Sequence, residues 1–144
     1  MESRHAIRMA AAVGGRAPLH CTAVGKVLLA HQPPDYVKQI LAQGLKAHTE
    51  NTVTKREALL SMLAEVAERE HAIDDEESEQ GLRAVAAPVR NHTGNVIAAL
   101  GVAAPVQRMT KKDMQTCVPS VIATAAAVSA RLGYVPSRPR ALAE

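Results

Sequence analysis

The sequence predicts a single α+β domain from its length, its composition and the mixture of its apolar segments. A chain of 144 residues fits one domain and buries roughly two thirds of its surface on folding. Apolar residues make up 47% and charged residues 22% of the chain, which are ordinary values for a globular protein and exclude a disordered chain. Capped helical segments and two apolar segments joined by a polar turn occur in the same chain. Together they predict helices packed on a sheet.

The first third of the chain contains one predicted strand and two predicted helices. Residues 7–13 form a small-residue apolar stretch typical of a strand, which Gly14 ends. Residues 24–30 predict a helix with Thr22 as its N-cap. A second, short helix is predicted over residues 36–42, after a pair of prolines that breaks the chain.

The clearest helical pattern begins at residue 54. Thr54 and Glu57 have the spacing of a capping box, in which the hydroxyl and the carboxylate bond free N–H groups at the start of a helix. One apolar stripe follows at helical spacing: Leu59, Met62, Leu63 and Val66. These features predict a helix that packs one face on the rest of the domain.

Two strands are predicted in the second half of the chain. They span residues 82–89 and 96–104 and are joined by the polar turn 90–95, in which Gly94 suits a positive φ. Both strands are apolar on both faces, so we expect other elements to cover each face. The acidic run at residues 74–79 is predicted to be a solvated bend before the first of these strands.

The last predicted helix starts at the N-cap Thr110, with Asp113 three residues on, and ends at about Leu132 before Gly133. Pro119 lies inside it and predicts a kink. Apolar residues recur along it at spacings of four and three: Met114, Val118, Val121, Ala125, Val128 and Leu132. This narrow seam favours packing against a sheet or a second helix.

Composition excludes several classes of function. The net charge of +3 is small and the basic residues are scattered, so no nucleic-acid footprint is predicted. The chain has no Trp, no Phe and two Tyr residues, which argues against a stacking platform for single-stranded nucleic acid. No apolar run reaches about 18 residues, and residues 1–15 lack the apolar core of a secretory signal. We therefore expect no membrane contact, a cytoplasmic location and no disulfide between Cys21 and Cys117.

The spacing of the reactive residues predicts neither catalysis nor metal binding. Gly25-Lys26 is not part of a phosphate-binding loop, because His20 and Val27 stand where that loop needs Gly and Ser or Thr. Lys26 is therefore interpreted as a surface or dimer-contact lysine. The pair His20-Cys21 would make a small hydrolase only with a third, orienting group, which the sequence does not show, so no enzyme is expected. The six histidines form no i, i+4 pair, which predicts no metal site and no cofactor.

One arrangement of residues predicts a small binding pocket. A helix starting near Thr22 points the N–H groups of Ala23 and Val24 outward, and such a helix end favours a carboxylate or phosphate. Strands rich in Ala and Gly would form the floor of the pocket, and an acidic residue before the first of them would accept hydrogen bonds from ligand hydroxyls. The alternative is that the small residues only allow tight packing of helix on sheet. The residues alone favour neither.

Several segments, in order, resemble the IclR-type bacterial transcriptional regulators. Residues 14–30, GGRAPLHCTAVGKVLLA, resemble the signature of that family, and residues 72–77, 81–89, 96–102 and the last helix continue the resemblance. It implies a GAF/PAS-like effector-binding domain, with a curved antiparallel sheet flanked by helices, that forms homodimers or tetramers. It also implies DNA binding through an N-terminal winged helix-turn-helix that this chain does not contain.

The same resemblance divides the chain into two parts. Residues 1–134 would be a partial effector-binding domain that lacks its N-terminal elements, and residues 135–144 a flexible C-terminal tail.

The family's pocket positions transfer to this chain one by one, as implications of the resemblance. The helix-start backbone corresponds to Ala23 and Val24, the acidic anchor to Asp74, and the apolar walls to Met9, Ala17 and Leu82. The family often has Cys at the position of Ala84, and Ser at the positions of Gly101 and Ala103. Replacing those polar groups leaves a facing polar ligand atom unsatisfied, at a cost of about 1–3 kcal/mol. We therefore expect an effector that is larger or less polar than a two- or three-carbon keto acid, such as an aromatic or longer-chain carboxylate.

The sequence thus predicts the small-molecule sensing domain of a DNA-binding regulator, with a carboxylate-type effector that alters operator affinity in the intact protein. The alternative is an oligomerisation module that associates through the last helix and has a vestigial pocket.

Overall fold

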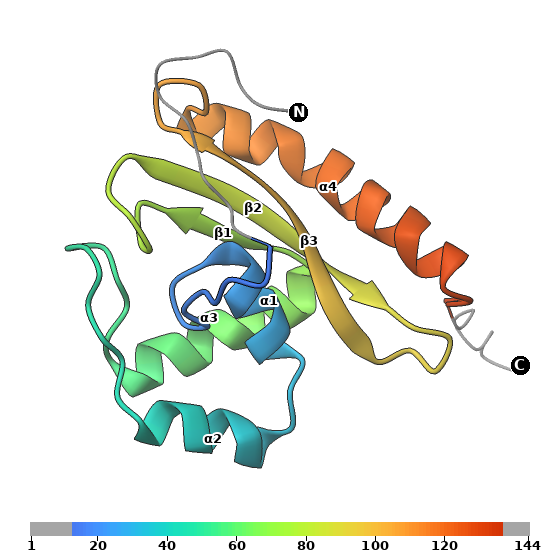
Figure 1. Cartoon of the computed structure of the whole chain (residues 1–144), viewed down its shortest axis with the longest axis horizontal. Coiled ribbons are helices and arrows are strands. Elements are labelled where there is room, and N and C mark those ends of the chain that lie inside the picture. The colour runs from blue at the N-terminus through green and yellow to red at the C-terminus, as the bar shows by residue number, and fades with distance from the viewer. Residues whose placement is uncertain (1–12, 137–144) are drawn as a thin grey trace, which may run out of the picture.

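The computed structural model describes residues 13–136 as four helices and a three-stranded antiparallel sheet in the order β1-β2-β3. The elements along the chain are α1 (Ala23–Ala30), α2 (Pro34–Ala42), α3 (Arg56–Arg69), β1 (Ala72–Asp75), β2 (Leu82–Arg90), β3 (Val96–Pro105) and α4 (Lys111–Arg131). The α4 helix runs along one side of the sheet, and α1 lies on the other side (Figure 1). The predicted α+β class with an antiparallel sheet is confirmed. Residues 7–12 of the first predicted strand lie outside the described residues.

One face of the sheet packs on α4. Alternate residues of a strand point to opposite faces, so Val85, Ala87 and Val89 of β2 share a face, and all three are buried. They form one apolar cluster with buried residues of α4, namely Met114, Val121 and Ala125. The predicted seam of the last helix is confirmed at these positions, and α4 continues through Pro119 as one helix.

The opposite face of the sheet packs on α1. Ala23 and Val27 of α1 form a second buried cluster with Ala72 of β1, Ala86 of β2 and Val66 of α3. Three members of this cluster are alanines, so the axis of α1 lies close to the sheet. A third cluster joins α2 to α1 and α3 on the side away from the sheet; its buried members are Leu29, Val37, Leu41, Leu59 and Leu63.

The two predicted strands differ in how well they are covered. The prediction that both faces of each strand are covered is confirmed for β2, whose residues from Val85 to Val89 are buried. It is wrong for β3, where Ile97 is 54% and Val102 41% exposed. The physical reason is position: β2 is the central strand between α1 and α4, whereas β3 lies at an edge of the sheet that residues 13–136 form.

The predicted N-cap at Thr110 and the predicted capping box at Thr54 have different outcomes. The N-cap at Thr110 is confirmed, and the structure completes it to a capping box: Asp113 N–H donates to the Thr110 hydroxyl (3.1 Å) and Asp113 Oδ2 accepts from Thr110 N–H (2.8 Å). The capping box predicted at Thr54 is wrong: the N-cap of α3 is Lys55, and no side chain bonds the N–H groups of that helix end. The helix begins one residue too late for the spacing of the predicted box.

The acidic run that follows α3 is partly buried, contrary to the predicted solvated bend. Its first residues complete a strand that the sequence did not predict, β1, which pairs with β2 so that Asp74 lies opposite Ala84. Asp74 is 1% and Glu77 7% exposed. Asp74 accepts hydrogen bonds from the turn that follows it, and Glu77 pairs with the buried Lys26. These partners compensate for the removal of both carboxylates from water.

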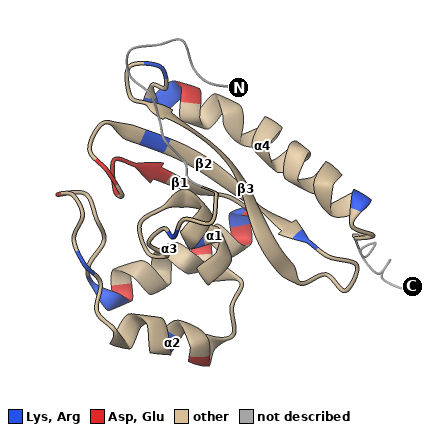
Figure 2. Cartoon of the chain, viewed as in Figure 1, with Lys and Arg blue, Asp and Glu red and all other residues tan. Residues whose placement is uncertain are grey.

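Charge is distributed unevenly over the fold (Figure 2). Acidic residues gather on β1 and the turn after it, where Asp75 pairs with Arg83 (2.7 Å) and with Lys111 (3.4 Å). Basic residues are spread over helices, strands and loops of the part of the chain that the structure describes. None of the helices in that part has the length and apolar character needed to cross a membrane.

Candidate functional site

The predicted pocket residues of the sheet all lie on the face that α1 covers. The strand register places Asp74, Ala84 and Ala103 opposite one another across the three strands. Leu82 and Gly101 share that face because they lie two residues away along their strands from Ala84 and Ala103. The sheet therefore brings five of the predicted residues together.

These five residues differ in exposure. Asp74 is buried, Leu82 and Ala84 are half-buried, and Gly101 and Ala103 are exposed. The exposed members lie on β3, so within the described part of the chain this face is closed at β1 and accessible at β3. Of the other predicted residues, Ala17 is exposed in the segment before α1, and Met9 lies outside the described residues.

The start of α1 sits against this face. The Thr22 hydroxyl accepts from Gly25 N–H (3.0 Å) and donates to the Pro18 carbonyl (2.6 Å), which confirms Thr22 as the N-cap. A side chain at Gly101 would come 3.3 Å from Val24 Cγ1. The missing side chain at Gly101 therefore lets the first turn of α1 approach β3, which is the tight packing that the sequence offered as its alternative.

Asp74 anchors the turn that follows β1. Its Oδ1 accepts from the N–H groups of Glu77 (2.8 Å) and Ser78 (3.2 Å), and its Oδ2 accepts from the Ser78 hydroxyl. An ionised carboxylate has about four lone-pair positions. Donors of the turn occupy three of them. Asp74 therefore holds the turn in place and keeps one acceptor position unoccupied by the turn.

Lys26 forms a buried ion pair with Glu77, and its predicted place at the surface or a dimer contact is wrong. Lys26 Nζ lies 2.6 Å from Glu77 Oε2, and the two side chains are 2% and 10% exposed. Burial raises the pKa of Glu77, and the neighbouring ammonium opposes that shift. Lys26 is on the buried side of α1, between the sheet and α3, so its charge needs a partner inside the fold. The one feature of the sequence that points to this ion pair is a lysine within an apolar helical segment.

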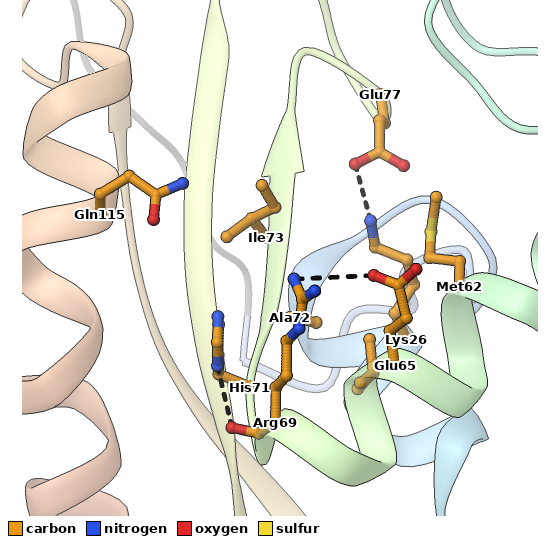
Figure 3. A pocket seen from close by; sticks show the side chains of 10 residues that line it. Lys26, Met62, Glu65, Arg69, His71, Ala72, Ile73, Glu77 and Gln115 are labelled. Atoms are coloured by element: carbon orange, nitrogen blue, oxygen red, sulfur yellow. Dashed lines mark hydrogen bonds and ion pairs between the residues drawn. The ribbon is translucent and has the colours of Figure 1, made fainter.

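The Lys26–Glu77 pair borders a cavity of about 350 Å³ between the end of α3 and the edge strand β1 (Figure 3). The side chains of Arg69 and His71 also line it, and Arg69 forms an ion pair with the Glu65 carboxylate there (3.6 Å). Glu77 Oε1 is buried and has no hydrogen-bond partner among the described residues. No pattern in the sequence predicts this cavity, because its residues come from α1, α3, β1, α4 and the segments on either side of β1.

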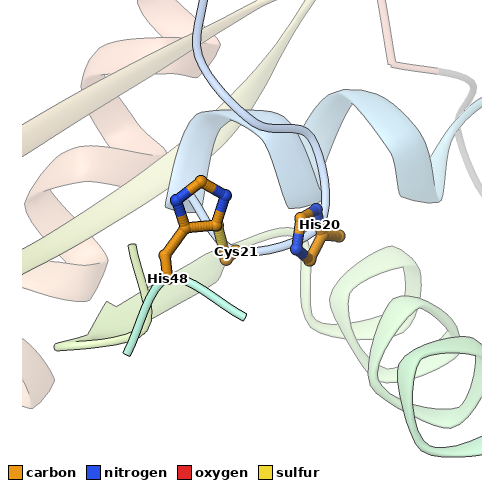
Figure 4. A group of neighbouring side chains, drawn as sticks. All are labelled: His20, Cys21 and His48. Atoms are coloured by element: carbon orange, nitrogen blue, oxygen red, sulfur yellow. The ribbon is translucent and has the colours of Figure 1, made fainter. Parts of the chain in front are cut away.

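A cluster of two histidines and a cysteine lies beside the start of α1 (Figure 4). His20 and Cys21 are buried, and His48 reaches them from the loop between α2 and α3. One ligand atom of each residue lies within 4.8 Å of the other two. The sequence shows no third residue next to His20 and Cys21. The fold places His48 beside them.

The Cys21 thiol is protonated at neutral pH. Burial, together with the nearby carboxylates of Asp74 and Glu77, raises the pKa of Cys21 to about 11. A nucleophilic cysteine needs the opposite shift. Both Cys21 and Cys117 are free thiols.

Comparison with known proteins identifies what this fold is similar to. Residues 1–130 match the family described as bacterial transcriptional regulator IclR C-terminal. Over 136 residues the chain is 43% identical to the HTH-type transcriptional regulator KdgR of Escherichia coli, an alignment that covers 93% of this chain and 51% of that one. The chain spans about half the length of the curated relatives it matches.

Solved structures show the same fold. A putative transcriptional regulator from Rhodococcus superposes with a TM-score of 0.86 at 30% identity, over 92% of this chain and 55% of that one. The inducer-binding domain of the PobR transcription factor from Acinetobacter, a double mutant in complex with 3-hydroxybenzoic acid, superposes with a TM-score of 0.74 at 31% identity. That alignment covers 81% of this chain and 67% of that one.

Proposed function

This chain belongs to the IclR family of bacterial transcriptional regulators and corresponds to their C-terminal effector-binding domain, and from that premise we propose that it binds a small carboxylate. Binding would favour one arrangement of domains or subunits and so change the operator affinity of the intact regulator. DNA contact would be made by a separate DNA-binding domain of that regulator. The regulator would act in the cytoplasm as a homodimer or tetramer.

The observation that carries this proposal is the shared sheet face beneath the start of α1. Asp74, Ala84 and Ala103 lie in one row, Leu82 and Gly101 beside it, and the first turn of α1 against it. A carboxylate placed there would bond the N–H groups of the first turn, Ala23 and Val24, where the helix dipole favours negative charge. Met9 and Ala17 complete the set of proposed effector contacts.

The small residues of this face favour an aromatic or longer-chain acid. Ala84, Gly101 and Ala103 offer neither a hydroxyl nor a thiol, so the polar groups of a short keto acid would stay unsatisfied at a cost of about 1–3 kcal/mol. An aromatic ring would fill the same space with apolar contacts. The PobR domain supports this choice, because its double mutant forms a complex with 3-hydroxybenzoic acid and is 31% identical to this chain. The spare acceptor position of Asp74 would take a ligand hydroxyl.

A thermal-shift screen tests the proposal. The chain is heated with benzoate and its hydroxylated forms, with longer aliphatic acids, and with glyoxylate and pyruvate. A ligand that binds only the folded state stabilises it by about 2.7 kcal/mol at a hundredfold excess over Kd. We expect the midpoint to rise with the aromatic or longer-chain acids and not with the keto acids. Equal or stronger effects of glyoxylate or pyruvate would contradict the expected effector class.

A pair of matched variants locates the site. Ala103→Leu places a large side chain on the proposed face and should abolish the shift. Ala98→Leu makes the same change at an exposed position of β3 on the opposite face of the sheet, so its shift should stay. A cooperative transition with no shift for any acid would instead favour the oligomerisation module.

A further inference from the structure

We propose that His20, Cys21 and His48 form a binding site for a divalent cation of the zinc type. The proposal rests on the geometry of this cluster alone and stands whether or not the domain binds a carboxylate. Two imidazole nitrogens and a sulfur are the ligands that zinc prefers, whereas magnesium and calcium take oxygen ligands. The donor set therefore selects the class of metal.

The distances are close to those of a metal site. One ligand atom from each side chain lies within 4.8 Å of the others. Around a tetrahedral zinc with bonds of about 2.0–2.3 Å, neighbouring ligand atoms lie about 3.5 Å apart. The side chains would have to close by roughly 1 Å, and His48 is free to move because it is exposed.

One ring nitrogen of His20 is already held by the backbone. Nε2 lies 2.8 Å from the Lys46 carbonyl, to which only an N–H can donate, so Nδ1 is the nitrogen that can bind a metal. Metal-binding histidines almost always donate their other ring N–H to a carbonyl, a carboxylate or a water, and this bond fixes the tautomer. The His20 and His48 rings lie with centroids 5.8 Å apart.

The loop that carries His48 is held in place by hydrogen bonds. The His48 N–H donates to Thr52 Oγ1 (3.0 Å), and that hydroxyl donates to the Glu77 carbonyl (2.6 Å). Thr49 adds a bond to the Glu76 carbonyl (2.6 Å). His48 therefore comes from a backbone that is positioned before any metal binds. A bound ion would tie this loop to Cys21, directly before α1.

The remaining coordination position would be filled by water. Three protein ligands leave one position of a tetrahedral zinc open. Of the three ligands, His48 is exposed, and it also lines a cavity of about 380 Å³ together with residues of the same loop and of the turn after β1. On binding, the Cys21 S–H bond breaks, a sulfur–metal bond forms, and one proton passes to solvent for each ion bound.

Cobalt titration of the whole chain tests the site, because Co²⁺ occupies zinc sites and reports a thiolate ligand by its near-ultraviolet charge-transfer absorption. We expect one Co²⁺ per chain, that absorption, and displacement by one equivalent of Zn²⁺. Cys21→Ser should abolish the absorption. His48→Ala, which alters an exposed residue and leaves the core intact, should weaken Zn²⁺ binding by at least about tenfold.

Two matched controls separate this cluster from other ligands of the same kind. Cys117→Ser removes the other free thiol, and His92→Ala removes another exposed histidine; both should bind as the unaltered chain does. Circular dichroism of each variant checks its fold. Unchanged Zn²⁺ affinity in His48→Ala, or cobalt binding without the thiolate absorption, would overturn the proposal. So would no stoichiometric binding by the unaltered chain.

Discussion

Lys26 and Glu77 show what a buried charge requires of its partner. Their ion pair is 2.6 Å long and almost fully removed from water. Removing one member of such a pair leaves an uncompensated charge in the core, which costs about 3–5 kcal/mol, whereas replacing both members is often neutral. We therefore expect Lys26→Met to lower the free energy of unfolding by about that amount, and Lys26→Met with Glu77→Gln to recover most of the loss. Urea denaturation of the two variants measures both.

The exposed pair Lys38–Asp35 is the control for this prediction. Its atoms are 3.8 Å apart, and the side chains are 66% and 92% exposed. Exposed pairs of this kind contribute about 0–1 kcal/mol, so Lys38→Met should change little. The double variant Lys26→Met with Glu77→Gln could instead be as unstable as Lys26→Met alone. That outcome would show that the packing of these side chains, and not the compensation of their charges, determines stability at this position.

The helices differ in how their first turns are stabilised. Thr110 and Asp113 bond each other's backbone N–H at the start of α4, while no side chain caps α3. Losing an N-cap hydroxyl costs about 1 kcal/mol, so Thr110→Ala should lower the free energy of unfolding by about that amount. Thr54→Ala should stay within about 0.5 kcal/mol. Urea denaturation of the two variants side by side measures the difference. Equal losses would mean that Thr54 caps α3 in solution.

The elements that the sequence predicts are those with local signals. Thr22 and Thr110 mark helix starts through bonds within one turn of the chain, and the polar turn between β2 and β3 marks a hairpin. β1 escaped prediction because it has four residues, half of them acidic. Its acids look solvent-exposed in the sequence, and only pairing with β2 takes Asp74 out of water.

The parts of the site that sequence reasoning missed depend on distant contacts. Lys26 meets Glu77 across 51 positions of the chain, and His48 meets Cys21 through the docking of a loop. No periodicity or spacing reports such contacts. The resemblance to the family placed Asp74, Ala84 and Ala103 in one pocket, and the strand register sets them side by side. Their contact with a ligand stays a prediction.

At the scale of the whole molecule, we expect Asp75 to contribute to the acid sensitivity of the fold. Hydrogen bonding to Arg83 holds the pKa of Asp75 below its ordinary value, and Lys111 adds to the effect. A carboxylate with a lowered pKa stabilises the folded state above its unfolded pKa of about 3.9, and this contribution is lost as the pH falls through the folded pKa. We expect Asp75→Asn to destabilise the fold at pH 7 by roughly 1–3 kcal/mol and to flatten the loss of stability below about pH 4.

Denaturation midpoints measured between neutral and acid pH check this prediction. Asp35→Asn is the control, since its carboxylate is 92% exposed and should leave the profile unchanged. A pH profile of Asp75→Asn that parallels the profile of the unaltered chain would assign the acid sensitivity to other carboxylates.

The edge strand β3 has a consequence for how the domain behaves at high concentration. Among the described residues only β2 pairs with it, and no charged residue interrupts it from Val96 to Pro105. Proteins usually protect such edges with lysines, prolines or a covering element, because an open edge is a template for aggregation. We therefore expect that two purified copies of this domain can pair along the edge of the sheet that the described residues leave open, with Ile97 and Val102 adding apolar contact. Ile97→Lys would place a charge on this edge, and we expect it to keep concentrated samples monodisperse in light scattering.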